Sequence, residues 1–500
     1  MTDDFSNRTE KFISWLQSNH VHVSPKVQIT DLRSINQGRG LIAVQDIKLD
    51  ETLFTIPRNI LINVANNALI KTYPDLYEKL LKLDHWHSLI IILLYEWKCI
   101  GKASKWSEYL DVLPINDEEN YQFDQLVFWM DEELEYLKPS LILQRVGKKS
   151  GYDLFAKIQS IVQELGIVEL KDVALDVYEK VAAIIMSYSF DVESPDATDS
   201  DNEDEADLDE EQVDGNILKD GYFKSMVPLA DTLNADTNLN NAVLTYSPTD
   251  LIMTSIKTIK KGEQIYNTYS DHPNSEILRR YGYVEPSGSK FDFGEIPLLT
   301  IKAHFIKKYE ISDSFINEIL TDISKASKQS QEEDVENDDE VAEIVLDSYD
   351  CFKSHEVIME FVFLIQILTI VFQTNRSELN NSDIYKRIFK KCYQLVESKR
   401  LTNGFVENYK ETIEERLSEY PRVASEPFGK SMDVGRKAMA EAVLKSEYQS
   451  LKNCLDVEKT LKETLGSYKL IEDEKLIRNI VKKRPTEDGR SGQKNKKSKR

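Results

Sequence analysis

The sequence predicts an α+β fold, in which a β-rich core is split by a helical insertion and followed by an all-α C-terminal domain. Short strand-like runs separated by turn residues occur near residues 41–57 and again near 242–269. In residues 64–190 and 291–480, apolar residues instead recur at three- and four-residue spacing. Because 500 residues exceed what one hydrophobic core holds, more than one domain is expected.

The N-terminal segment, residues 1–23, predicts a short amphipathic helix that packs on the core. Residues 24–63 then read as a glycine turn, a strand, a polar turn and a second strand. The glycine turn is Gln37-Gly38-Arg39-Gly40. It lacks the third glycine and the following helix of a dinucleotide site, so by itself it indicates only a tight turn.

The insertion, residues 64–190, contains two motifs that we interpret as packing elements. One is the compact segment 105–114, KWSEYLDVLP. The other is the triplet His85-Trp86-His87, which no further cluster of His, Cys or carboxylates completes, so no metal site is expected. The four cysteines are scattered singly, which favours neither a zinc site nor a disulfide framework and is typical of an intracellular protein.

The second half of the core, residues 216–290, begins with an apolar run that breaks into Asp231, Asn234 and Ala235 within a polar loop. A hairpin follows, with strands at 242–246 and 251–259. A further strand is expected to end at Tyr269, and a short helix to end at Tyr281.

Charge indicates the kind of partner. The net charge of −23 argues against nucleic-acid binding and suits a basic protein substrate attracted electrostatically. Residues 191–215 and 332–343 are strongly acidic with almost nothing to bury, so we expect the first to be a disordered loop and the second to interrupt the C-terminal helices in the same way. They are read as solvated spacers, with a docking role for a basic substrate as the alternative.

The apolar stretches 89–95 and 357–372 are too short to span a bilayer, and the polar N-terminus has no signal core. Buried helices and no membrane association are therefore expected. In the basic tail, residues 481–500, two clusters of lysine and arginine are separated by a spacer, as in a bipartite nuclear import signal. This predicts a location in the nucleus, possibly also the cytoplasm, and the alternative is a solubilising tail.

The order of these motifs resembles the SET-domain protein methyltransferases, in the subgroup similar to the Rubisco large-subunit methyltransferase. The resemblance rests on the glycine turn and on three later motifs: MVPLAD-x-x-N at 226–234, KKGEQIYNTY at 260–269 and LRRYGYVE at 278–285. It implies a SET core, a helical substrate-binding domain, S-adenosyl-L-methionine as cofactor, and transfer of a methyl group to a lysine of a large (60S) subunit ribosomal protein. A monomer is expected.

The resemblance also implies roles for individual residues. Tyr269 matches the catalytic tyrosine, and Phe190 and Tyr281 match residues that line the lysine channel. The residues implied in cofactor binding are Gln37, Gly38, Arg39, Gly40, Asp231, Asn234, Ala235, Tyr269 and Tyr281.

Two positions depart from the family pattern. Ala235 stands where histidine is usual, and Tyr188 stands where arginine is often found. These departures leave open a catalytically weak SET-like binding module. A protein-histidine methyltransferase is a further alternative, because one branch of the subgroup resembles such enzymes.

Overall fold

The computed structural model describes residues 4–116, 121–194, 217, 220–333, 343–379, 382–428 and 435–481. The chain forms two compact units: Met1–Asp292 with Glu426–Ser446, and Phe293–Ser425 with Glu447–Arg500. Most of the two acidic runs and the basic tail from residue 482 onward lie outside the described residues, so their predicted character remains an expectation.

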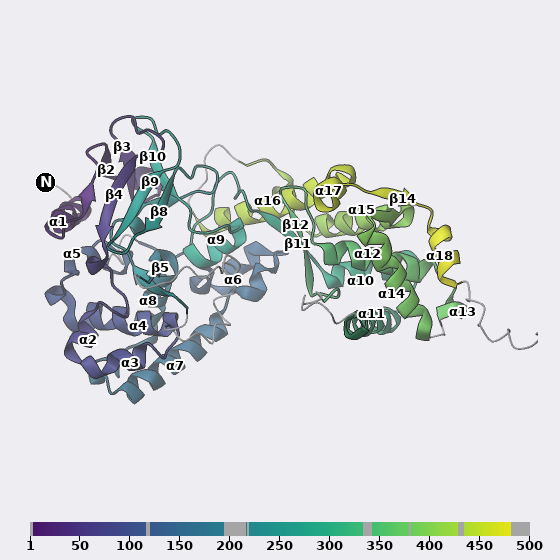
Figure 1. The fold of residues 1–500 in the computed structure, drawn as a ribbon, viewed down its shortest axis with the longest axis horizontal. Helices are drawn as coiled ribbons and strands as arrows, with labels where there is room; N and C mark the ends of the chain where they lie inside the picture. Colours follow the sequence, from purple (N-terminus) through teal and green to yellow (C-terminus); the bar gives the residue numbers. More distant parts are fainter. Residues whose placement is uncertain are drawn as a thin grey trace, which may run out of the picture. The chain divides into compact units, whose positions relative to one another are not determined.

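The first unit contains two four-stranded sheets (Figure 1). Because the strands alternate buried and exposed side chains, each sheet turns an apolar face to one shared core. One sheet has the order β1 (His22–Val23), β4 (Thr52–Pro57), β9 (Asp250–Ser255), β8 (Ala242–Tyr246). The other has the order β2 (Val27–Asp31), β3 (Arg39–Ala43), β10 (Gln264–Asn267), β7 (Asn234–Ala235). A separate pair joins β5 (Ser189–Glu193) to β6 (Tyr222–Met226).

The predicted hairpin is confirmed, since β8 pairs with β9 in an antiparallel register that sets Tyr246 opposite Leu251. Two strand ends were predicted wrongly. Strand β9 ends at Ser255 rather than at residue 259. Strand β10 ends at Asn267, so Tyr269 lies two residues beyond the strand that it was predicted to end. The alternation of apolar residues continues to Tyr269, but only residues 264–267 pair with a neighbouring strand.

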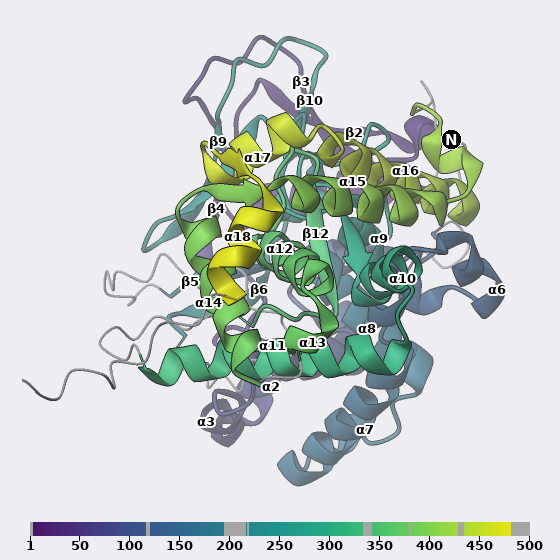
Figure 2. The same cartoon turned by 90° about the vertical axis from the view of Figure 1, so that its right-hand side faces the viewer.

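The helices of the insertion lie mainly at the end of this unit that is away from β3 and β10 (Figures 1 and 2). Helix α4 packs against α8, α7 and β6 and is buried from Leu89 to Leu94, which confirms the buried helix predicted there. The helices of this unit before α16 are α1 (Asp4–Ser18), α2 (Ala68–Thr72), α3 (Tyr77–Leu80), α4 (His85–Leu94), α5 (Ser107–Leu110), α6 (Asp131–Leu134), α7 (Lys148–Leu165), α8 (Leu175–Tyr188) and α9 (Asn274–Tyr281).

The two histidines of the insertion pair with carboxylates. The Nε2 atom of His85 lies 2.9 Å from Asp220, and its ring stacks on Tyr222 with centroids 4.2 Å apart. His87 pairs with Asp84 at the start of α4. Within the described ranges, no group of three or more His, Cys, Asp or Glu side chains is arranged to hold a metal ion.

A late segment of the chain completes the first unit. Helix α16 (Arg436–Cys454) contributes its residues up to Ser446 to this unit. The guanidinium of Arg436 donates to the Asp124 carboxylate at 3.0 Å and to the carbonyl oxygen of Phe123 at 3.0 Å. A small core joins α16 to the insertion and to α9; it includes Leu126, Trp129, Leu278, Ala440 and Val443.

This assignment corrects the prediction that residues 291–480 form one C-terminal domain. The helical period of a sequence shows that a segment has an apolar face, but it does not show which distant segment covers that face. The contact between Arg436 and Asp124 joins positions 312 residues apart.

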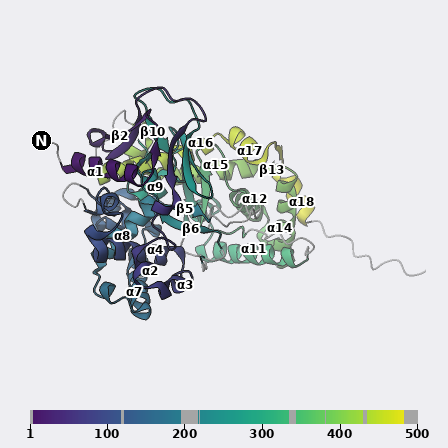
Figure 3. The same ribbon diagram turned by 60° about the vertical axis from the view of Figure 1, so that its left-hand side comes forward.

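The second unit is largely helical, and α12 is buried on all sides, which confirms the buried helix predicted at 357–372. Helices α14 and α15 pack against α12, and α11 packs against α14 (Figure 3). Helix α10 packs against α15 and α11. Within the described part of the chain, no helix is long and apolar enough to cross a bilayer. The helices are α10 (Leu298–Tyr309), α11 (Asp313–Glu333), α12 (Met359–Gln373), α13 (Arg376–Leu379), α14 (Ser382–Glu397), α15 (Asn403–Ser418), the end of α16, α17 (Val457–Leu465) and α18 (Asp473–Val481).

The predicted α+β fold is confirmed, but the C-terminal region is largely helical rather than all-α. Strand β11 (Phe293–Pro297) pairs antiparallel with β12 (Ser348–Phe352), and β13 (Arg400–Thr402) pairs in parallel with β14 (Lys469–Ile471). Runs of three to five residues are too short to display a strand period that stands out from flanking helices.

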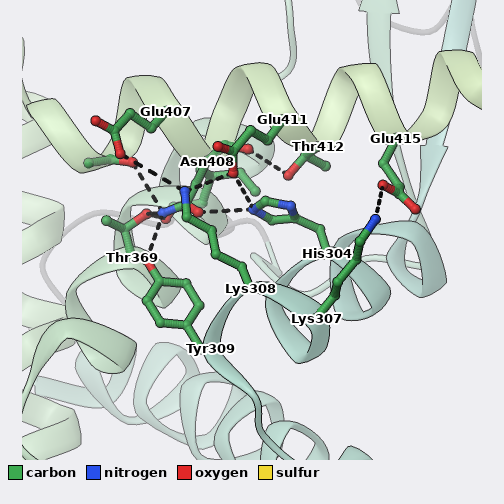
Figure 4. Close-up of polar contacts among 12 residues, drawn as sticks. His304, Lys307, Lys308, Tyr309, Thr369, Glu407, Asn408, Glu411, Thr412 and Glu415 are labelled. Atoms are coloured by element: carbon green, nitrogen blue, oxygen red, sulfur yellow. Dashed lines mark hydrogen bonds and ion pairs between the residues drawn. The ribbon is translucent and has the colours of Figure 1, made fainter.

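A buried polar network holds α10 against α15 and α12 (Figure 4). The amide oxygen of Asn408 lies 2.9 Å from the Nε2 atom of His304, and its amide nitrogen donates to Thr369 at 2.9 Å and to Tyr309 at 3.2 Å. Burial lowers the pKa of His304, which favours the neutral imidazole that donates to Asn408. One asparagine therefore satisfies polar groups from two neighbouring helices.

Asn408→Ala is expected to lower the free energy of unfolding of the second unit by about 2 kcal/mol, because it leaves buried donors and acceptors unpaired. Denaturant unfolding monitored by circular dichroism measures the change. Asn317→Ala is the matched control: Asn317 is exposed on α11, and its side-chain amide donates to Asp313 at 2.8 Å. Equal shifts for the two variants would contradict the role of the network.

Candidate functional site

Strand β10 brings together three segments of the predicted site. On one side it pairs antiparallel with β3, which leads out of the glycine turn, with Ile265 opposite Leu41. On the other side it pairs in parallel with β7, so that Tyr266 lies opposite Asn234 and Asn267 opposite Ala235. The chain then continues from β10 to Tyr269. The glycine turn and the Asn234–Ala235 segment thus flank the strand that delivers Tyr269.

The glycine turn is shaped by its two glycines in different ways. Gly38 has a φ of +57°, which favours glycine, and a Cβ there would meet nothing within 4 Å. Gly40 has no room for a Cβ, which would lie 2.8 Å from the Nδ2 atom of Asn234 and 2.5 Å from Leu32. The Nδ2 atom of Asn234 donates to the carbonyl oxygen of Arg39 at 3.2 Å. Asn234 therefore fastens β7 to the turn.

Gln37 lies in the same turn, where its Oε1 atom accepts a hydrogen bond of 2.7 Å from Gln264 of β10. The other amide atom of Gln264, Oε1, is buried and has no hydrogen-bond partner among the described residues. An unpaired buried acceptor beside an open glycine turn fits a ligand that brings an N–H or O–H donor.

The structure places the side chain of Arg39 away from β10. Its guanidinium donates to Thr9 at 2.9 Å and to the carbonyl oxygen of Val112 at 3.1 Å, and it lies 3.8 Å from the ring centroid of Phe5. The guanidinium thus ties the turn to α1 and to the segment after α5. The part predicted for Arg39 in cofactor binding can come only from its backbone.

Asp231 is buried in a 3₁₀ turn, Ala230–Thr232, just before β7. Its carboxylate accepts a hydrogen bond from the fully buried hydroxyl of Tyr109. Burial raises the pKa of Asp231 to about 7, although the hydrogen bond from Tyr109 lowers it. Tyr109 belongs to the motif that was predicted only to pack, and its partnership with Asp231 had no signal in the sequence.

Tyr269 is oriented by its hydroxyl and by its ring. The hydroxyl donates to the carbonyl oxygen of Leu233 at 2.8 Å. The ring meets Tyr281 and Tyr283 edge-on, with centroids 5.1 and 6.2 Å away. Burial raises the pKa of Tyr269 well above its usual value, so the phenol remains neutral at physiological pH. Its oxygen then keeps lone pairs free to accept from a neighbouring group.

Two more tyrosines join this group. Tyr188, at the end of α8, lies near Tyr269 and Tyr121. Burial raises the pKa of both phenols. Sequence reasoning noted Tyr188 only as a departure and missed Tyr121, which lies in an irregular segment without periodic pattern.

Phe190 lies two residues after Tyr188, on β5, opposite Ser225 of β6. It is half-buried against the main core, and its part in a lysine channel stays a prediction. Tyr281 ends α9 as predicted, and its ring contacts those of Tyr269 and His272, whose centroids are 5.1 and 6.2 Å away.

Comparison with known proteins gives three findings. A model of the SET domain matches residues 38–270. The ribosomal lysine N-methyltransferase 4 of Saccharomyces cerevisiae is 41% identical over 508 residues, which cover 98% of each chain. The N-lysine methyltransferase setd6 of Salmo salar is 30% identical and is matched over 59% of this chain and 62% of its own.

Among solved structures, Rubisco LSMT bound to sinefungin and monomethyllysine matches with a TM-score of 0.62. The match covers 94% of this chain and 95% of that chain at 17% sequence identity. At this identity the likeness concerns the fold, a β-rich core followed by a largely helical part.

Proposed function

Because the chain belongs to the SET-domain lysine methyltransferases, which use S-adenosylmethionine, we propose that its substrate is a lysine of a large (60S) subunit ribosomal protein. The observation that carries this proposal is the 41% sequence identity, over 98% of both chains, to the ribosomal lysine N-methyltransferase 4 of Saccharomyces cerevisiae. The charge of this chain supports it, since −23 favours encounter with a basic protein.

The residues around β10 fit the cofactor. The open turn at Gly38 lets backbone groups approach a ligand, and the unpaired oxygen of Gln264 offers an acceptor beside it. Asn234 and Ala235 present backbone and amide groups on the other side of the strand. When bound, S-adenosylmethionine supplies a methyl group on a positively charged sulfur.

A lysine side chain must lose its proton before it can accept a methyl group. Free lysine has a pKa of about 10.4, so the neutral amine is a minor form at neutral pH. The aromatic surroundings of Tyr269, Tyr281 and Tyr283 disfavour the ammonium and lower that pKa in the required direction. Little further acid–base machinery is needed.

Tyr269 then aligns the reacting groups. Its hydroxyl proton is engaged by the carbonyl oxygen of Leu233, which fixes the direction of the phenol oxygen. That oxygen can accept weak C–H hydrogen bonds from a polarised methyl group and an N–H from the amine. Holding amine and methyl in line lowers the barrier without a charged catalyst.

Incubation of the protein with radiolabelled S-adenosylmethionine and separated ribosomal subunits tests the proposal. We expect label in one protein of the 60S subunit, located by mass spectrometry to a lysine, and none in the 40S subunit. Label on a histidine would contradict the lysine assignment. Absence of label, with cofactor binding detected by calorimetry, would indicate a binding module instead.

We also propose that the protein acts in the nucleus. The basic clusters at 482–484 and 494–500 resemble an import signal. Removal of residues 482–500 is expected to leave methyl transfer intact and to move a fluorescent fusion out of the nucleus. Changing lysine and arginine to glutamine only in 494–500 should do the same, since both clusters are needed. Nuclear retention of both variants would rule the signal out.

A further inference from the structure

A buried carboxylate lies behind the loop that follows β7. Glu285 is 2% exposed, and its Oε1 atom accepts the backbone N–H of Thr237 at 2.6 Å. Its Oε2 atom accepts the hydroxyl of Thr237 at 2.6 Å and the side-chain amide of Asn238 at 3.1 Å. Three donors from two adjacent residues thus converge on one carboxylate.

Glu285 is itself firmly held. Its backbone N–H donates to the Oδ1 atom of Asn274 at 2.8 Å, and its carbonyl oxygen accepts from the Nδ2 atom of Asn274 at 3.0 Å. The backbone N–H of Asn274 donates in turn to Asp292 at 2.9 Å. The carboxylate is therefore a fixed point for the loop.

The loop held by Glu285 is continuous with the site. It begins directly after Ala235, where the N–H of Asp236 donates to the carbonyl oxygen of Asn267 at 3.2 Å. It returns to β10 at Asn241, whose Oδ1 atom accepts the N–H of Tyr266 at 2.9 Å. The side chain of Glu285 holds the middle of the loop, at Thr237 and Asn238.

We propose that Glu285 is a positioning residue for cofactor binding: its carboxylate fixes the loop after Asn234 and Ala235 and so sets the position of the β7 segment. This inference rests on the proposed assignment of that segment to the cofactor. Glu285 touches neither β7 nor Tyr269 through a hydrogen bond of its side chain, so its effect falls on binding rather than on the transfer step.

The ionisation state of Glu285 gives the arrangement a pH dependence. Burial raises the pKa of Glu285 to about 7, the hydrogen bonds from Thr237 lower it, and the nearby Asp236 and Asp292 raise it. Tyr283, which also faces Glu285, stays neutral because burial raises the pKa of its phenol. Below pH 7 the protonated carboxyl has one acceptor fewer for the loop donors. Cofactor affinity should accordingly fall as the pH drops through about 7.

Glu285→Gln tests the proposal, because it keeps the shape and replaces one acceptor oxygen with a donor. We expect the Kd for S-adenosylmethionine at pH 8 to rise about 10-fold, which corresponds to loss of a charge-assisted hydrogen bond, with kcat at saturating cofactor within about 3-fold. The decline of affinity below pH 7 should be present in the wild type and absent in the variant. Thr237→Val, which removes one donor, should weaken binding in the same direction even if the first variant folds poorly.

Glu295→Gln is the matched control, since Glu295 is a buried glutamate of the second unit and accepts from Ser348 at 3.2 Å. It should leave the cofactor Kd unchanged. A wild-type Kd and an unaltered pH profile in Glu285→Gln, alongside weakened binding in Asn234→Ala, would overturn the positioning role alone. A wild-type Kd in Asn234→Ala would overturn the assignment of the segment itself.

Discussion

Tyr269→Phe is expected to lower the rate of methyl transfer at least about 100-fold, a loss of about 2.7 kcal/mol, while the Kd for the cofactor stays within a few-fold of wild type. The substitution keeps the ring that meets Tyr281 and Tyr283 edge-on and removes only the hydroxyl that Leu233 orients. Single-turnover kinetics with saturating cofactor, together with calorimetry, separates the two quantities.

Tyr349→Phe provides a matched control for this experiment. Tyr349 is a buried tyrosine of the second unit whose hydroxyl also donates to a backbone carbonyl oxygen, that of Ile344, at 3.0 Å. It should lose a comparable hydrogen bond and retain the rate of methyl transfer. A Tyr269→Phe protein with wild-type turnover would remove Tyr269 from the mechanism.

Gly282→Ala is expected to lower the free energy of unfolding of the first unit by about 3 kcal/mol or more, the sum of left-handed strain and overpacking. Gly282 ends α9 with a φ of +73°, and a Cβ there would lie 2.8 Å from the backbone nitrogen of Gln125. Backbone atoms cannot swing aside as a side chain can. The substitution should therefore displace the segment that carries Tyr121, and lower activity as well.

Gly166→Ala measures the effect of left-handed backbone strain without overpacking. Gly166 ends α7 with a φ of +72°, and its Cβ would meet nothing within 4 Å. We expect a loss of about 1 kcal/mol for this variant, from strain alone. Chemical denaturation followed by tryptophan fluorescence measures both variants, and equal losses would contradict the close approach of Gly282 to Gln125.

The elements predicted best are those whose evidence is local. The β8–β9 hairpin has two apolar runs separated by turn residues, and α12 has a long, mostly apolar stretch. Tyr281 was placed correctly at the end of α9 for the same reason. The convergence of the glycine turn, Asn234 and Tyr269 on β10 was predicted only through resemblance to a family, since no local pattern states which strands pair.

The parts that were missed depend on contacts between distant, irregular segments. Tyr109 lies 122 positions from the Asp231 carboxylate that it holds. Tyr121 begins an irregular segment, and nothing in its neighbourhood repeats with a helical or strand period. Contacts between distant segments depend on the tertiary structure, so the local pattern of a single sequence does not predict them.

The attachment of Arg436 to Asp124 and Phe123 has a consequence for protein synthesis. The ribosome synthesises the first unit up to Asp292 long before it reaches the segment that completes this unit, Glu426–Ser446. At about 5–20 residues per second, the intervening stretch of about 150 residues takes roughly 8–30 s to translate. During that interval α16 does not yet cover the apolar side chains of Leu126, Trp129 and Leu278. A nascent chain with this exposed apolar surface is expected to bind chaperones.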